Sequence, residues 1–222
     1  MTLPPQEAPK NEDFIAAHTA PGHGTLVPEI ELALATEITP IWQASEEWLH
    51  KNGIEPPFWA FAWPGGQSLA RHILDNPSLV AGKRVLDFAA GCGIAAIAAA
   101  QAGASLVEAS EIDALACAAI RLNASRNAVT VAALDEDVVG APCRWDVILC
   151  GDVCYEAPMT RHILPWMRAM AGQALVLVAD PGRAYLPGSG KQVLAEYDVI
   201  TSTELEDRTL RRTAIYRLLP ED

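Results

Sequence analysis

The stretch VLDFAAGCGIAAIAAA, residues 85–100, decides the fold of this chain. A short apolar run containing Asp87 leads into Gly91 and Gly93, and the chain then passes directly into an alanine-rich segment. This order is typical of a buried strand, a tight turn and a helix. Glycines let the backbone approach a ligand closely, and a helix N-terminus offers free N–H groups with a partial positive charge. The stretch therefore predicts the first strand and the cofactor loop of a nucleotide-binding sheet.

The region after Lys83 repeats the same order of elements. Short apolar runs end in Asp or Glu and are followed by alanine-rich stretches, which is typical of parallel strands alternating with helices. We expect strands at 84–88, 106–110, 129–134, 146–151 and 174–179, and a closing antiparallel hairpin from 198–203 and 209–218. The predicted fold class is α/β: a Rossmann-like, seven-stranded, mostly parallel twisted sheet with helices on both faces.

Two local signals mark helix ends within this region. Gly103 directly follows the alanine run 95–102, as a glycine just past a helix C-terminus does. Asp113 stands where it can cap a helix that continues to Arg121.

The N-terminal part of the chain has a different character. Residues 1–24 carry four prolines among polar residues, which indicates a loose arm. Between 29 and 48 the apolar positions are irregular and Pro40 interrupts them, so we expect two short helical pieces. The length suits one α/β domain. We therefore expect an N-terminal extension at 1–56 and one catalytic domain at 57–222.

Composition limits the classes of partner. The formal net charge is −12 and the sequence pI is about 4.8, which opposes a nucleic acid and suits a cationic partner. No apolar run approaches the roughly 20 residues that span a bilayer, and the start has neither a signal peptide nor an Arg-rich transit helix. Five cysteines form no C-x-x-C pair, and five histidines show no ligand spacing. We expect a monomer in the cytoplasm, with no metal and no membrane contact.

The glycine-rich turn allows two interpretations. Gly91, Gly93 and Ala96 satisfy the dinucleotide fingerprint, and Glu111 lies where a ribose-binding acid should, as in an NAD-dependent oxidoreductase. Asp87 argues for another ligand, because an acid there would repel a pyrophosphate. It would instead attract the ammonium and sulfonium groups of S-adenosylmethionine. This second interpretation makes the chain a methyltransferase.

Each acid then has an expected cofactor contact. Asp87 faces the methionyl end of S-adenosylmethionine, Gly91 and Gly93 line the cofactor, and Glu111 accepts both ribose hydroxyls. After the third strand, Asp135 is the acid nearest the strand end, and we expect it to accept a hydrogen bond from the adenine amino group.

Several motifs resemble those of a known family. VLDFAAGCG resembles motif I of the seven-strand methyltransferases, SEID at 110–113 their acidic second motif, and GDVCYE at 151–156 the D-x-x-[YF] motif of a protein-lysine methyltransferase group. With FWAFAWPGG at 58–66 and DPGR at 180–183, the chain is most similar to the electron transfer flavoprotein β-subunit lysine methyltransferases. The resemblance covers about residues 26–218. Ala89 stands where motif I often has glycine, and an alanine is tolerated there if its φ is negative.

The resemblance implies a reaction and its residues. The cofactor is S-adenosylmethionine, the acceptor is a protein lysine, and the partner is the electron transfer flavoprotein β subunit. Asp152 orients the incoming lysine, Tyr155 shapes its channel, and Trp63 forms a wall of the methionyl pocket. The acceptor amine must be neutral, and desolvation lowers the pKa of a lysine, so a dedicated base is optional.

Other interpretations remain open at this point. A ribosomal protein is an alternative substrate, because ribosomal-protein methyltransferases share much of this motif set. A small-amine methyltransferase, a nicotinamide oxidoreductase and a non-catalytic binding module are further alternatives. Asp152 could merely cap a helix that begins near Pro158, Trp59 could belong to the core, and DPGR could be an entrance loop with Asp180 close to the substrate or only a turn.

Overall fold

The computed structural model describes residues 8–36, 39, 41, 51, 56–201 and 209–220. Parts of three expectations lie outside these residues: 1–7 of the arm, most of 37–48 in the two expected helical pieces, and 202–203 of the first hairpin strand. Within the described ranges, no helix is long and apolar enough to cross a membrane.

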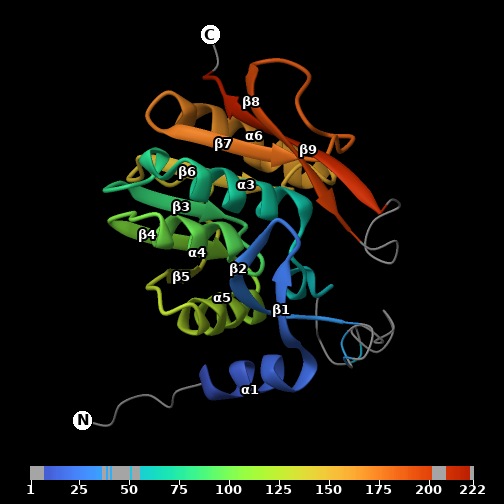
Figure 1. Ribbon diagram of the computed structural model, residues 1–222. Helices are drawn as coiled ribbons and strands as arrows, with labels where there is room; N and C mark the ends of the chain where they lie inside the picture. The colour runs from blue at the N-terminus through green and yellow to red at the C-terminus, as the bar shows by residue number, and fades with distance from the viewer. Residues whose placement is uncertain are drawn as a thin grey trace, which may run out of the picture.

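The centre of the molecule is a seven-stranded sheet (Figure 1). Its strands are β3 (Arg84–Phe88), β4 (Leu106–Glu111), β5 (Ala132–Asp135), β6 (Val147–Gly151), β7 (Leu175–Asp180), β8 (Lys191–Ile200) and β9 (Leu210–Leu218). They lie in the order β5-β4-β3-β6-β7-β9-β8. The first five pair in parallel, and β9 pairs antiparallel with both β7 and β8. The predicted fold class and closing hairpin are confirmed.

Helices cover both faces of this sheet (Figure 1). One face carries α3 (Pro64–Asp75), α4 (Ile94–Gln101) and α5 (Ala114–Arg126), and the other carries α6 (Ala157–Ala171). The helix-end signals hold: Gly103 has φ +88° just after α4, and the Asp113 Oδ1 accepts from the Leu115 N–H at 2.8 Å. The capped helix runs five residues past the expected Arg121, to Arg126.

The two outer strands differ most from their expected bounds. β8 begins at Lys191 and not at 198, and β5 begins at Ala132 and not at 129. The register of β8 shifts between Val193 and Ala195, so its side chains do not alternate cleanly between buried and exposed. This irregularity hides the strand from a pattern that assumes a period of two.

The N-terminal part is the main difference from expectation. Instead of a loose arm, residues 8–24 form α1 (Ala8–His18) and β1 (Ala20–Gly24), and β2 (Val27–Leu34) replaces the start of the expected helical pieces. The two strands form an antiparallel hairpin. Such a two-stranded ribbon has only edges, and edge strands tolerate prolines such as Pro21 and Pro28.

Buried contacts join this N-terminal part to the sheet domain. Ile15 of α1 and Ala33 of β2 pack in one apolar cluster with Trp59 and with alanines of α5. Trp59 is 1% exposed, so it belongs to the core. The chain division at 56/57 stays a prediction, because these contacts link the two parts without showing where one ends.

Asn123 of α5 connects three segments by hydrogen bonds. Its Oδ1 accepts from the Ala33 N–H at 2.8 Å, and its Nδ2 donates to the Cys92 carbonyl at 2.9 Å. The side chain is completely buried. It therefore fixes β2 and the glycine-rich turn to the same helix.

We expect Asn123→Ala to lower the free energy of unfolding by about 3 kcal/mol, because it leaves a buried N–H and a buried carbonyl without partners. Urea denaturation measures this loss. Asn76→Ala is the matched control, since the Asn76 amide donates to the His72 carbonyl in an exposed position. Equal effects of the two substitutions would contradict a special role for Asn123.

Candidate active site

Acidic residues gather at one edge of the sheet. Each of the five parallel strands carries an acid at or beside its carboxyl end: Asp87, Glu111, Asp135, Asp152 and Asp180. The sheet also reverses its direction of winding at this edge, since β4 and β5 follow on one side of β3 and β6 and β7 on the other. Crevices at such switch points bind ligands in open α/β sheets.

The turn between β3 and α4 is shaped by left-handed backbone. Ala89, Gly91 and Gly93 have φ values of +50°, +55° and +76°. A Cβ on Gly93 would also lie 3.2 Å from the Ile120 side chain. The expectation of a negative φ at Ala89 is wrong, so its methyl group is held in a conformation that costs an L-residue about 1–2 kcal/mol.

Asp87 lies beneath this turn and is buried. Its Oδ2 accepts from the Ala96 N–H at 2.9 Å, in the first turn of α4. Burial raises the pKa of this carboxyl to about 8, although the Ala96 N–H opposes the shift. Asp87 thus fixes the N-terminus of α4 through this hydrogen bond. Its expected contact with the methionyl group of S-adenosylmethionine stays a prediction.

Glu111 approaches the same turn from β4. Its Oε1 accepts from the Gly91 N–H at 2.7 Å, and burial raises the pKa of its carboxyl. Asp135 is the register partner of Glu111 on β5, and its side chain is exposed. The structure therefore brings Glu111, Gly91 and Asp135 to one end of the edge, as their expected ribose and adenine roles require.

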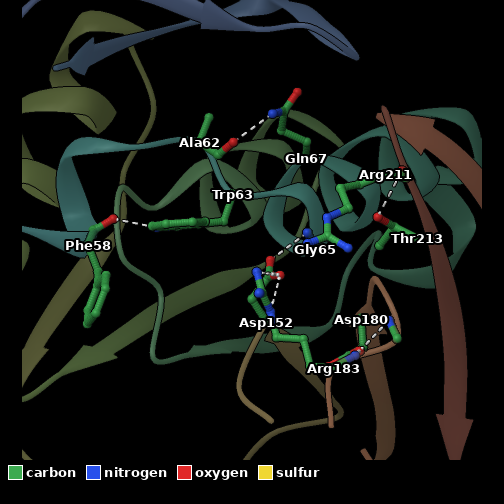
Figure 2. A network of polar contacts seen from close by, with 11 residues as sticks. Phe58, Ala62, Trp63, Gly65, Gln67, Asp152, Asp180, Arg183, Arg211 and Thr213 are labelled. Atoms are coloured by element: carbon green, nitrogen blue, oxygen red, sulfur yellow. Dashed lines mark hydrogen bonds and ion pairs between the residues drawn. The ribbon is translucent and has the colours of Figure 1, made fainter. Parts of the chain in front are cut away.

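Asp152 lies at the other side of the switch point, directly after β6, with φ +57°. Its Oδ2 accepts from the Gly65 N–H at 2.5 Å, while its Oδ1 accepts from Arg183 Nε at 3.2 Å and Nη2 at 2.8 Å (Figure 2). The alternative of a cap on the following helix is wrong, because the N-cap of α6 is Glu156. Asp152 instead satisfies a first-turn N–H of α3.

The N-terminus of α3 fits against β6 and β7 because Gly65 has no side chain. A Cβ there would lie 2.5 Å from Asp152 Oδ2 and 2.6 Å from the Ala179 carbonyl oxygen. Trp63, the N-cap of α3, is thereby placed beside the site, and its Nε1 donates to the Phe58 carbonyl at 2.8 Å (Figure 2).

Three aromatic rings line the rim of this region. The Phe58 ring centroid lies 6.0 Å from that of Trp63 and 5.8 Å from that of Tyr155. Phe58 is 49% exposed and Tyr155 is 42% exposed, which is unusual for large rings beside a core. Sequence reasoning selected Trp63 and Tyr155 but missed Phe58, although it stands in the quoted aromatic segment.

The DPGR segment forms a turn that reaches back over β6. The Asp180 Oδ1 accepts from the Gly182 N–H at 2.7 Å and from the Arg183 N–H at 2.6 Å. The turn carries Arg183 to Asp152 (Figure 2). Sequence reasoning did not foresee this ion pair, because nothing in the local pattern links the two positions.

Comparisons with known proteins agree with this geometry. Over 218 residues the chain is 38% identical to the electron transfer flavoprotein beta subunit lysine methyltransferase of Xenopus laevis, covering 93% of this chain and 86% of that protein. It is 33% identical over 228 residues to the Homo sapiens protein of the same name, covering 96% and 83%. The chain belongs to this family. The expected activity, methyl transfer from S-adenosylmethionine to a protein lysine, is thereby confirmed. The alternative of an NAD-dependent oxidoreductase is rejected.

Two further likenesses concern the fold and the cofactor-binding part. A sequence model of the ribosomal protein L11 methyltransferase family, PrmA, matches residues 69–152. Magnesium protoporphyrin IX methyltransferase from Synechocystis PCC 6803, solved with bound S-adenosylmethionine, is 17% identical with a TM-score of 0.52, covering 69% of this chain and 77% of that one. At that identity the structural likeness speaks for the fold alone.

The residues at the edge fit S-adenosylmethionine well. The turn with Gly91 and Gly93 leaves room for close approach to the N-terminus of α4. Carboxylates at Glu111 and Asp135 suit ribose hydroxyls and an adenine amino group, while the acidic surroundings suit a ligand that carries a sulfonium and an ammonium. The individual contacts remain predictions.

We expect Ala89→Gly to raise the free energy of unfolding by about 0.5 kcal/mol, because relief of the positive φ exceeds the entropy that glycine adds to the unfolded chain. Ala100→Gly, inside α4, should instead lower it by about 1 kcal/mol. Urea denaturation of both variants checks the opposite signs. A loss of stability in Ala89→Gly would contradict strain at this position.

We expect Glu111→Ala to weaken binding of S-adenosylmethionine about 100-fold, because two hydrogen bonds to a charged group are lost. Titration calorimetry measures the dissociation constant. Glu196→Ala is the control, because this exposed acid stands on β8, at the opposite end of the sheet from β4 and β5, and the variant should bind the cofactor normally. Normal affinity in Glu111→Ala would remove this residue from the ribose site.

Proposed function

We propose that this chain methylates lysine side chains of the electron transfer flavoprotein beta subunit. The observation that carries the proposal is Asp152 with Tyr155 at the carboxyl end of β6, in a chain whose relatives at 33–38% identity are named for that substrate. The net charge of −12 supports an acceptor that presents lysines.

The ribosomal-protein alternative has less support. The PrmA family model ends at residue 152 and so includes the cofactor turn but not Tyr155 or the DPGR segment. Its match therefore concerns the part that methyltransferases of this fold share. A ribosomal protein remains an outcome that the acceptor assay below can reveal.

Alignment of the acceptor is the main task of the protein groups. When bound, S-adenosylmethionine supplies an electrophilic methyl group. Asp152 receives the acceptor nitrogen by a hydrogen bond and faces the positive charge that develops there, while the rings of Tyr155 and Phe58 hold the alkyl part of the lysine. Contact with these two rings would displace water from around the acceptor nitrogen, which favours the neutral amine.

The ionisation of Asp152 sets a lower pH limit for this arrangement. Burial raises the pKa of its carboxyl to about 6, while Arg183 and the Gly65 N–H oppose the shift. The carboxylate is therefore the main form at neutral pH and is lost as the pH falls through about 6. Deprotonation of the acceptor needs no side-chain base, because the proton can leave to solvent before docking.

The cysteines and the net charge bear on the compartment and the partners of the enzyme. All five cysteines are free thiols, and four of them are buried. This supports a reducing compartment, for which we propose the cytoplasm. The acidic charge opposes nucleic-acid binding, and we propose a monomer that acts on a separate protein substrate.

We expect Asp152→Asn to lower kcat/KM for the flavoprotein about 100-fold, because the acceptor nitrogen loses its orienting charge, and Tyr155→Ala to raise KM more than it lowers kcat. The assay follows labelled methyl groups from S-adenosylmethionine into the purified beta subunit, with mass spectrometry to locate the modified lysine. Asp137→Asn, an exposed acid, is the control.

Three results would contradict the proposal. Label that appears only in a ribosomal protein of the lysate would move the substrate to the alternative. Label confined to small molecules would indicate a small-amine enzyme. Full activity of Asp152→Asn would remove this carboxylate from the acceptor site.

A further inference from the structure

We propose that Arg183 is a positioning residue for the methyl transfer, acting through Asp152: its guanidinium fixes the carboxylate that receives the acceptor nitrogen. The inference rests on the proposed role of Asp152 and adds a residue from a different loop. Arg183 need not touch the substrate or the cofactor for this role.

The geometry leaves the Asp152 carboxylate little freedom. Two nitrogens of Arg183 donate to Oδ1, at 3.2 Å and 2.8 Å, while the Gly65 N–H donates to Oδ2 at 2.5 Å. Both side chains are largely buried, with 20% of Arg183 and 11% of Asp152 exposed. A charge-assisted pair with two donors restricts direction as well as distance. Donors at both of its oxygens thus fix the orientation of the carboxylate.

Arg183 is itself held in place by the turn after β7. The backbone N–H of Arg183 is bonded to the Asp180 Oδ1 at 2.6 Å, and Gly182 takes φ +87°, which closes the turn tightly. The guanidinium carbon also lies 6.0 Å from the centre of the Trp63 ring, within reach of a cation–π contact. The guanidinium therefore has a defined location between the β7 turn and the aromatic rim.

The charges around Asp152 also favour such a role. Asp180 is buried next to it, and its Oδ2 has no hydrogen-bond partner among the described residues. The negative charge of Asp180 raises the pKa of Asp152, whereas Arg183 lowers the pKa of both acids. Cys154, a further titratable group nearby, has its pKa raised to about 12 by burial and so stays neutral. Arg183 is the cation that keeps Asp152 ionised near neutral pH.

The sign of the pH effect follows from these charges. Removing Arg183 takes away an influence that lowers the pKa of Asp152, which burial already raises to about 6. In its absence the carboxyl would be protonated over a wider range and would ionise only at higher pH. If Arg183 only linked the two loops structurally, its removal would lower the activity by the same factor at every pH.

The experiment compares Arg183→Met, Arg183→Lys and Asp152→Asn with the two double variants that combine Asp152→Asn with each Arg183 substitution. Arg84→Met is the matched control, because Arg84 also donates from Nε and Nη2 to a single carboxylate, to Asp146 Oδ2 at 3.2 Å and Oδ1 at 3.0 Å, at the amino end of β3. Methyl transfer to the purified flavoprotein beta subunit is measured from about pH 6.5 to about pH 9. Thermal unfolding and the dissociation constant for S-adenosylmethionine are measured for each variant.

We expect Arg183→Met to lower kcat/KM about 10- to 100-fold near pH 7, with a deficit that shrinks as the pH rises. The ratio to wild type cancels the ionisation of the acceptor lysine, which affects both proteins equally. Arg183→Lys should recover part of the activity, since it restores the charge but not the fork. In the Asp152→Asn background, Arg183→Met should cause no further loss. Binding of S-adenosylmethionine and the activity of Arg84→Met should match wild type.

Several outcomes would overturn the inference. They are full activity of Arg183→Met, a loss that is the same at every pH, or a loss that adds to that of Asp152→Asn. If Arg183→Met does not fold, Arg183→Lys decides alone, because its deficit must vanish in the Asp152→Asn background. If Asp152→Asn loses activity and Arg183→Met does not, this inference alone is refuted. Full activity of Asp152→Asn, or an inactive wild type, refutes the proposed function and this inference with it.

Discussion

The close approach of the α3 N-terminus to the ends of β6 and β7 is the constraint on which the proposed acceptor side of the site depends. Gly65 and Gly151 meet there without side chains; a Cβ on Gly151 would lie 2.9 Å from the Gly66 nitrogen. Asp152 then bonds in two directions, with its backbone N–H donating to the Ala179 carbonyl at 3.0 Å and its side chain accepting from Gly65. Two glycines and one acid thus bring the aromatic segment, β6 and β7 to one place.

The same kind of hydrogen bond is found at four of the five parallel strand ends. Buried or half-buried carboxylates at strand ends accept backbone N–H groups of a neighbouring turn: Asp87 from Ala96, Glu111 from Gly91, Asp152 from Gly65 and Asp180 from Gly182. Each bond gives a strand-end carboxylate a backbone donor, and each also fixes a segment that borders the ligand site. The same acids therefore both fix these segments and line the site.

The acids at this edge fall into two groups on either side of the switch point. The proposed cofactor side consists of Gly91 in the β3–α4 turn with Glu111 and Asp135 at the ends of β4 and β5, and the proposed acceptor side consists of Asp152 and the β7 turn. The two sides meet at β3 and β6, where the sheet changes its direction of winding. A methyl donor and an amine can be aligned across such a boundary without a mobile catalytic group.

The sequence by itself determined the sheet, the cofactor turn and the acids at its edge, because these depend on local signals. Strand and helix periods, a glycine-rich turn and an acid at a strand end are all read within about a dozen residues. The family resemblance added the lysine acceptor through GDVCYE and FWAFAWPGG. Only the tertiary structure decided that residues 8–34 form a helix and a hairpin, that Trp59 lies in the core, and that Arg183 pairs with Asp152. These outcomes depend on contacts between distant segments, such as Ala33 with Asn123, and no local periodicity records which distant groups will meet.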